Sequence, residues 1–88
     1  MNYRVFWHPG AELLLDKLIE AAEEPGKIAV AAKEIDRQLV RDPFGFGESR
    51  DERVRIAFVS PLAVEFHVVR DVSTVIVFNV WRTGRRQH

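Results

Sequence analysis

The sequence predicts an α+β fold with the element order β-α-α-β-β-β, in which a helix hairpin packs on one face of a mainly antiparallel four-stranded sheet. The first half of the chain holds two stretches with helical spacing of apolar residues. The second half holds three stretches rich in β-branched and aromatic residues, and one more such stretch precedes the helices. At 88 residues, we expect a single domain that spans residues 1–88.

The composition is typical of a folded, soluble protein. The chain is 47% hydrophobic and 30% charged, which indicates neither disorder nor a membrane span. Thirteen basic and thirteen acidic residues cancel, so the total charge predicts no general attraction to nucleic acid. Because the chain has no cysteine, and because its first residues lack the apolar core of a secretion signal, we expect a cytoplasmic protein.

The N-terminal half is expected to form one strand and two helices. Residues 3–7 carry aromatic and β-branched side chains, which are typical of a short strand, and Pro9 marks its end. Apolar residues recur at helical spacing over residues 11–22 and again over residues 28–39. Pro43 ends the second helix, and the short connection between the helices predicts an antiparallel hairpin.

The C-terminal half is expected to form a loop and a β-meander. Residues 42–52 contain glycines, a proline and a charged tail, which predict a loop. Strand patterns follow at residues 53–59, 63–69 and 75–81. The three strands should form an antiparallel meander whose apolar face is covered by the helix hairpin.

In the first two strands of this meander, side chains alternate with a period of two, which predicts which face each one occupies. The apolar set consists of Val54, Ile56, Phe58, Leu62, Val64, Phe66 and Val68. We expect this set to face the helices, which requires an odd number of loop residues around Ser60 and Pro61. On the third strand, Ile76, Phe78 and Val80 are expected to share the covered face.

The opposite, outer face is expected to gather polar and aromatic groups. Its expected members are Arg53, Arg55, Glu65, His67, Asn79 and Trp81. A three-residue loop would set Arg55 opposite His67, whereas a five-residue loop would set Arg55 opposite Glu65. Val75 and Val77 would lie on this outer face too.

These residue types suit chemistry on a phosphodiester. Arginines bind phosphate and stabilise the charged transition state, while Glu65 and His67 can transfer protons. Trp81 can stack a base. This chemistry needs no metal or other cofactor, and the histidines show no metal-ligand spacing. The same residues are also typical of an ordinary solvated sheet face, where a cross-strand Arg–Glu pair contributes little stability.

The whole chain resembles the RelE/ParE superfamily of small bacterial toxins of type II toxin–antitoxin systems. The resemblance is carried by YRVFWHPGAE opening into a helix, EIDRQLVRDPFGFGESR leaving the second helix, RVRIAF followed by PLAVEFHV, and the final VIVFNVWR. The order and spacing of these segments match the family from end to end. The resemblance implies a compact toxin that is neutralised by a cognate antitoxin protein.

In the RNA-cleaving branch, the resemblance implies ribosome-dependent cleavage of messenger RNA by basic residues on the sheet face. Arg53 and Arg55 match the alternating basic pair of that branch, and Arg82, or Arg85 after a bulge, matches its basic residue beyond the last strand. Glu65 and His67 enter from the alternation alone. The expected site comprises Arg53, Arg55, Glu65, His67 and Arg82 as catalytic residues, and Trp81, Arg85 and Arg86 as RNA-binding residues.

Two other functions stay open. The second branch of the superfamily implies a non-enzymatic inhibitor of DNA gyrase that uses the helix hairpin and the C-terminal surface. The third function is a catalytically inactive protein-binding module, in which Val69, Val75, Val77 and Trp81 receive a strand or helix of the antitoxin. The expected partners are therefore an antitoxin with messenger RNA and the ribosome, or an antitoxin with DNA gyrase, and in no case a membrane.

Overall fold

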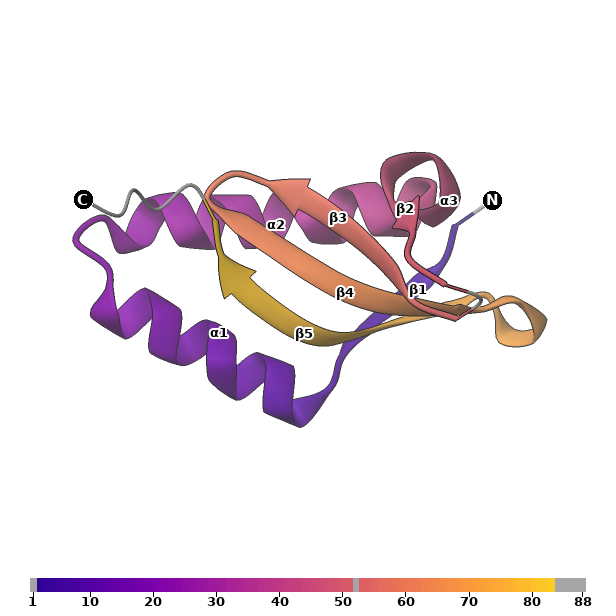
Figure 1. Cartoon of the computed structure of the whole chain (residues 1–88), viewed down its shortest axis with the longest axis horizontal. Coiled ribbons are helices and arrows are strands. Elements are labelled where there is room, and N and C mark those ends of the chain that lie inside the picture. The colour runs from indigo at the N-terminus through magenta and orange to yellow at the C-terminus, as the bar shows by residue number, and fades with distance from the viewer. Residues whose placement is uncertain (1, 52, 84–88) are drawn as a thin grey trace.

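The structure, a computed structural model, describes residues 2–51 and 53–83, which form a helix layer on one face of a five-stranded sheet (Figure 1). The elements in chain order are β1 (Arg4–Trp7), α1 (Pro9–Ala21), α2 (Pro25–Arg41), α3 (Pro43–Phe46), β2 (Glu48–Ser49), β3 (Arg55–Val59), β4 (Leu62–Val69), the 3₁₀ helix η1 (Arg70–Val72) and β5 (Thr74–Arg82). The strand order is β1-β5-β4-β3-β2. Within the described ranges, no helix has the length and apolar character needed to cross a membrane.

The expected α+β class and the helix hairpin on one sheet face are confirmed, but the four-stranded description is wrong. The sheet is mixed, because β1 pairs in parallel with β5 while the other pairs are antiparallel. The expected loop over residues 42–52 contains α3 and the short edge strand β2. Its DPFG sequence begins α3: Pro43 occupies the first turn, and the Asp42 side chain accepts a hydrogen bond of 3.0 Å from the Gly45 N–H.

The hydrophobic core lies between α2 and the sheet. It consists of Ile28, Ala31, Ala32, Ile35 and Leu39 from α2, and of Ala57, Leu62, Val64, Phe66, Val75, Val77 and Val80 from the strands. Side chains of α1 and β1 pack against its border, and Trp7 Nε1 donates a hydrogen bond of 2.7 Å to Asp36 Oδ1 on α2. The helices therefore cover one sheet face and leave the other without a covering layer.

The side chains of β4 lie on the sheet faces that the sequence alternation predicts. Those of β3 lie on the opposite faces from the predicted ones. Val59 pairs directly with Leu62, so only Ser60 and Pro61 connect the strands. An even number of loop residues places the odd-numbered residues of β3 on the covered side, because side chains alternate between faces. Phe58 is accordingly 55% exposed. The expectation that Ile56 and Phe58 face the helices is wrong.

A bulge divides β5 into two registers. Val77 pairs with Phe66 and Asn79 pairs with Glu65, so Phe78 is an extra residue that shifts the alternation by one position. After the bulge the residues lie on the predicted faces: Val80 on the covered face, and Asn79 and Trp81 on the outer face. Before the bulge the prediction is inverted: Val75 and Val77 are fully buried in the core, and Ile76 and Phe78 do not face the helices.

Candidate functional site

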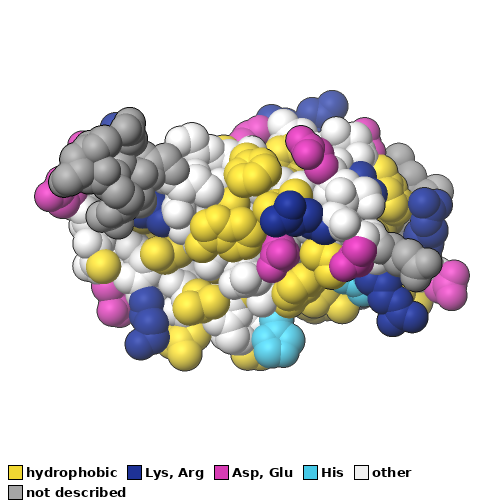
Figure 2. Space-filling model, viewed as in Figure 1, with side chains coloured by type: hydrophobic (Ala, Val, Ile, Leu, Met, Phe, Trp, Pro, Cys, Tyr) yellow, Lys and Arg dark blue, Asp and Glu magenta, His cyan; other side chains and the backbone are white. Residues whose placement is uncertain are grey.

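The uncovered sheet face, called the open face below, carries the candidate site. Its side chains form three rows across the strands: Phe58, Ala63 and Trp81; Ile56, Glu65 and Asn79; and His67, Ile76 and Phe6. Figure 2 shows hydrophobic side chains gathered over the strands, with a few charged side chains set among them. Aromatic groups thus surround two groups that can transfer protons, Glu65 and His67.

Glu65 is half-buried in the middle row and is held by its neighbour on β5. Asn79 Nδ2 donates a hydrogen bond of 3.1 Å to Glu65 Oε1. Asn79 Oδ1 in turn accepts one of 2.9 Å from the Val80 N–H. Because the amide is fixed by the backbone, the carboxylate is also held in one orientation on the open face.

His67 is half-buried on β4, and its ring reaches back to the chain that enters β3. Its Nδ1 lies 2.9 Å from the carbonyl oxygen of Arg53. A carbonyl oxygen only accepts hydrogen bonds, so Nδ1 carries the proton and, in the neutral ring, Nε2 carries the lone pair. The imidazole is therefore in the tautomer that a general base on the open face requires.

The turn before β3 depends on Asp51, a residue that the sequence arguments did not include. Asp51 Oδ1 accepts hydrogen bonds from the Arg53 N–H at 2.9 Å and from the Val54 N–H at 3.0 Å. These two bonds, that of Arg53 first, lower the pKa of Asp51. The preference of aspartate for bonding the backbone two residues ahead is the sequence feature that could have indicated this turn.

Arg55 does not belong to the open face, which corrects the expected placement. It pairs with Phe66 and lies on the covered side, where Nη2 donates hydrogen bonds of 2.9 Å to the carbonyl oxygens of Phe44 and Gly47. The guanidinium carbon is 5.1 Å from the centre of the Phe44 ring. The prediction that Arg55 stands opposite Glu65 or His67 is wrong, because the two-residue loop inverts β3.

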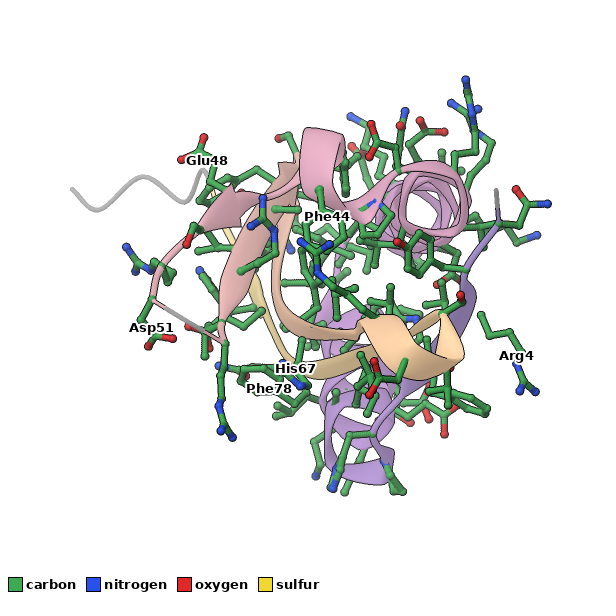
Figure 3. All side chains as sticks on the ribbon, turned by 90° about the vertical axis from the view of Figure 1, so that its right-hand side faces the viewer. Arg4, Phe44, Glu48, Asp51, His67 and Phe78 are labelled. Atoms are coloured by element: carbon green, nitrogen blue, oxygen red, sulfur yellow. The ribbon has the colours of Figure 1, made fainter. Side chains whose placement is uncertain are left out.

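Figure 3 shows this separation: Phe44 lies at α3 near the helices, whereas His67 lies on the other side of the sheet. The guanidinium carbon of Arg70 lies 4.4 Å from the centre of the same Phe44 ring, so two arginines contact this ring. Because Arg55 also bonds the Phe44 and Gly47 carbonyls, it anchors the α3–β2 segment to the sheet.

The remaining expected site residues are dispersed. Trp81 lies on the open face, as expected, and Arg53 is exposed in the turn before β3. Arg82 pairs with Leu62 and lines a cavity of about 910 Å³ between the start of α2 and the β3–β4 turn, so it does not join His67. Arg85 and Arg86 lie outside the described residues. Among residues 2–51 and 53–83, no group of three or more His, Cys, Asp and Glu could hold a metal ion.

Chemically, the open face offers proton transfer and stacking. Glu65 and His67 are two residues apart on β4, so their Cα atoms are about 7 Å apart on the same face. Phe58 and Trp81 lie on either side of Ala63 in the neighbouring row. Of the two arginines expected on this face, Arg55 lies on the covered side, so Arg53 is the one that stays near Glu65 and His67.

No protein-family model and no curated protein matches the sequence. Solved structures match the fold of this chain nearly end to end.

The toxin–antitoxin complex RelBE2 from Mycobacterium tuberculosis matches with a TM-score of 0.79 and 21% identity, covering 93% of this chain and 99% of that chain. The isolated RelE toxin of E. coli matches with a TM-score of 0.70 and 15% identity, covering 97% and 88%. The chromosomal ParDE system of P. aeruginosa matches with a TM-score of 0.64 and 20% identity, covering 92% and 96%. The chain therefore has the fold of the RelE and ParE toxins.

Proposed function

We propose that this chain, whose fold is that of the RelE/ParE toxins, is the toxin of a type II toxin–antitoxin system and cleaves messenger RNA without a metal ion. The observation that carries the enzymatic part is the tautomer of His67: Nδ1 is bonded to the Arg53 carbonyl, which leaves Nε2 as a proton acceptor. The toxin assignment is supported by the fold shared with RelBE2, RelE and ParDE.

In the proposed reaction, His67 Nε2 takes the proton of a ribose 2′-hydroxyl, and that oxygen attacks the neighbouring phosphorus. The bond from phosphorus to the 5′-oxygen breaks, and a water molecule bonded to the Glu65 carboxylate gives a proton to this leaving oxygen. The products are a 2′,3′-cyclic phosphate and a 5′-hydroxyl. Arg53 stabilises the charge that develops on the phosphate oxygens.

Base binding is assigned to the aromatic row of the open face. Phe58 is 55% exposed, and Trp81 is half-buried two strands away with Ala63 between them. Aromatic side chains on an uncovered sheet can stack bases, with little preference for sequence. We therefore assign selection of the cleavage position to a larger partner, the ribosome, rather than to this face.

The test is primer extension on cellular messenger RNA after brief induction of the wild-type chain and of His67→Ala. We expect new RNA ends with the wild type and a loss of about 10²-fold or more in the variant, the usual contribution of a general base. His8→Ala is the matched control, because His8 Nδ1 accepts a hydrogen bond from Gly10 N at the start of α1. Unchanged cleavage by His67→Ala would exclude this mechanism.

A non-enzymatic inhibitor of DNA gyrase is the second candidate, and one observation favours it. Arg55 lies on the covered side, so the open face holds fewer cations than RNA binding usually requires. Exposed Phe6 and Phe58, each 55% exposed, suit contact with a protein instead. Growth arrest with gyrase-dependent DNA damage, and without new RNA ends, would favour this function.

A cognate antitoxin is the proposed partner in either case. The expected receiving surface changes, because Val75 and Val77 are buried in the core and are not accessible to a partner. Val69 and Trp81 remain partly exposed. Co-purification of this chain with the product of a neighbouring gene would test the partnership.

A further inference from the structure

We propose that Asp51 is a positioning residue for His67 and that it acts through the peptide group between Arg53 and Val54. The arrangement is a carboxylate–histidine pair with one peptide group between its two members. Its consequence for RNA cleavage rests on the proposed function, whereas its effect on the imidazole does not.

The peptide group between Arg53 and Val54 makes one hydrogen-bond contact at each of its polar ends. Asp51 Oδ1 accepts a hydrogen bond of 3.0 Å from the Val54 N–H. The carbonyl oxygen of Arg53, which belongs to the same peptide group, is 2.9 Å from His67 Nδ1. One peptide group therefore joins the carboxylate to the imidazole.

The geometry of this peptide group fixes the direction of the Arg53 carbonyl. A trans peptide group is planar, and its N–H and C=O bonds point in opposite directions. When Asp51 holds the Val54 N–H on one side, the Arg53 carbonyl is directed to the other side, where His67 lies. The second bond, from the Arg53 N–H to the same Asp51 oxygen at 2.9 Å, limits rotation of the chain at Arg53.

The Asp51 carboxylate also acts electrostatically on His67 through this peptide group. A carboxylate that accepts from the N–H polarises the peptide group, so its carbonyl becomes a stronger acceptor for Nδ1–H. When Nε2 takes a proton, the imidazolium is stabilised along the same path, as a directly bonded aspartate does in a Ser-His-Asp triad. The lowered pKa of Asp51, caused by the two backbone hydrogen bonds, keeps its carboxyl ionised at neutral pH.

The turn that carries Asp51 is braced at both ends. The Arg50 N–H donates to the Val54 carbonyl at 2.8 Å, and Ser49 Oγ donates to the Asp51 carbonyl at 3.1 Å. Ser49 pairs with Arg55, which is itself anchored to α3. Figure 3 shows Asp51 in the turn beyond β2, on the side away from the helices. The carboxylate thus holds its orientation without a covering layer.

The test is the tautomer of His67 in the full-length chain, measured by long-range ¹H–¹⁵N NMR at about pH 8, where an ordinary histidine is neutral. We expect the Nδ1–H form to dominate in the wild type and to lose population to the Nε2–H form in Asp51→Ala. Asp51→Asn should retain the wild-type tautomer, because its amide oxygen can accept the same two hydrogen bonds.

Asp42→Ala is the matched control, since Asp42 also accepts a backbone hydrogen bond, from Gly45, but at α3. It should leave the His67 tautomer unchanged. A folded Asp51→Ala that keeps the wild-type tautomer would overturn the proposal, as would loss of this tautomer in Asp51→Asn.

Cleavage gives a second measurement. Asp51→Ala should lower it about tenfold, the lower end of the loss seen when a metal-bound histidine loses its outer hydrogen-bond partner, and Asp51→Asn should recover most of the loss. A wild-type chain that cleaves no RNA would overturn the proposed function instead, and the NMR result would still decide the positioning role.

Discussion

The two faces of the sheet use the same residue types for different purposes. On the covered side, Phe66 is fully buried, Arg55 bonds two carbonyl groups, and Trp7 bonds Asp36. The open face and its rim hold the counterparts of these residues: Phe58, Arg53 and Trp81. Phenylalanine, arginine and tryptophan therefore each occur both as structural support on the covered side and as candidate functional surface on the open face, and the side of the sheet decides which.

This pairing teaches that chemical type alone does not identify a site residue. Arg53 and Arg55 are two positions apart, a spacing that would place both on one face of a regular strand. Arg53 lies before the first residue of β3, however, in the turn that Asp51 holds. The regular alternation begins only at Arg55, so the two guanidinium groups serve different regions.

The largest difference in stability between the two sheet faces is expected for the phenylalanines Phe66 and Phe58. Phe66→Ala should lower the free energy of unfolding by about 3–5 kcal/mol, because it leaves a cavity in the core. The Phe66 ring also packs where a side chain on Gly47 would be, so the loss extends to the α3–β2 connection. Urea denaturation monitored by circular dichroism measures the change.

Phe58→Ala is the control for this prediction, since the side chain is 55% exposed. Its cost should stay below about 1 kcal/mol. Equal costs for the two variants would contradict the inverted facing of β3.

The next largest difference in stability is expected between the alanine variants of Arg55 and Arg53. Arg55→Ala removes two charge-assisted hydrogen bonds to carbonyl groups, and part of the loss is offset because Arg55 Nε is buried without a partner among the described residues. We expect a cost of about 2 kcal/mol in the free energy of unfolding. Thermal and urea denaturation measure it.

Arg53→Ala should change stability by less than about 0.5 kcal/mol, because the side chain is exposed. Arg55→Lys should recover only part of the loss, since an ammonium group does not reproduce the planar guanidinium on Phe44. If Arg55→Ala were neutral and Arg53→Ala costly, the assignment of the two roles would be reversed.

A smaller difference in stability is expected between the phenylalanine variants of Trp7 and Trp81. Trp7→Phe keeps most of the ring but removes the 2.7 Å hydrogen bond to Asp36, which joins β1 to α2. A loss of about 1 kcal/mol in the free energy of unfolding is expected.

Trp81→Phe provides the matched substitution on the open face and should cost less than Trp7→Phe. Its expected effect is on RNA binding, measured as weaker retention of single-stranded RNA. A larger stability loss for Trp81→Phe would mean that the open face supports the fold more than the β1–α2 contact does.

Much of the fold could be predicted from the sequence, because periodicity reports on burial. The helical stripe of α2 and the alternation of β4 both predict the core residues that the structure contains. The parallel β1–β5 pair and the strand β2 were not predicted, since β2 is only two residues long and its pairing depends on tertiary contacts.

The site was harder to predict than the fold, because the face of a strand depends on counts of single residues. The two-residue loop at Ser60 and Pro61 inverts β3, and the bulge at Phe78 inverts the first half of β5. Glu65 and His67 were placed correctly because they lie on β4, whose alternation no bulge interrupts. Asp51 was missed because its contribution is a contact with the backbone.

The smallest expected effect is found in the helix layer, where it can be separated from both sheet faces. Hydrogen bonds from Arg37, and then from Gln38, lower the pKa of Glu34 on α2 to about 2. Because this pKa lies below the ordinary value of 4.5, the ionised carboxyl stabilises the fold above about pH 4.5, and this contribution is lost as the pH falls through about 2. Glu34→Gln should therefore be less stable than the wild type near neutral pH, and the difference should shrink on acidification. Urea denaturation at a series of pH values measures it, and salt should weaken it because the pair is at the surface. In an Arg37→Ala background most of the difference should vanish, whereas a difference independent of pH would show that packing of the side chain, rather than its charge, supports α2.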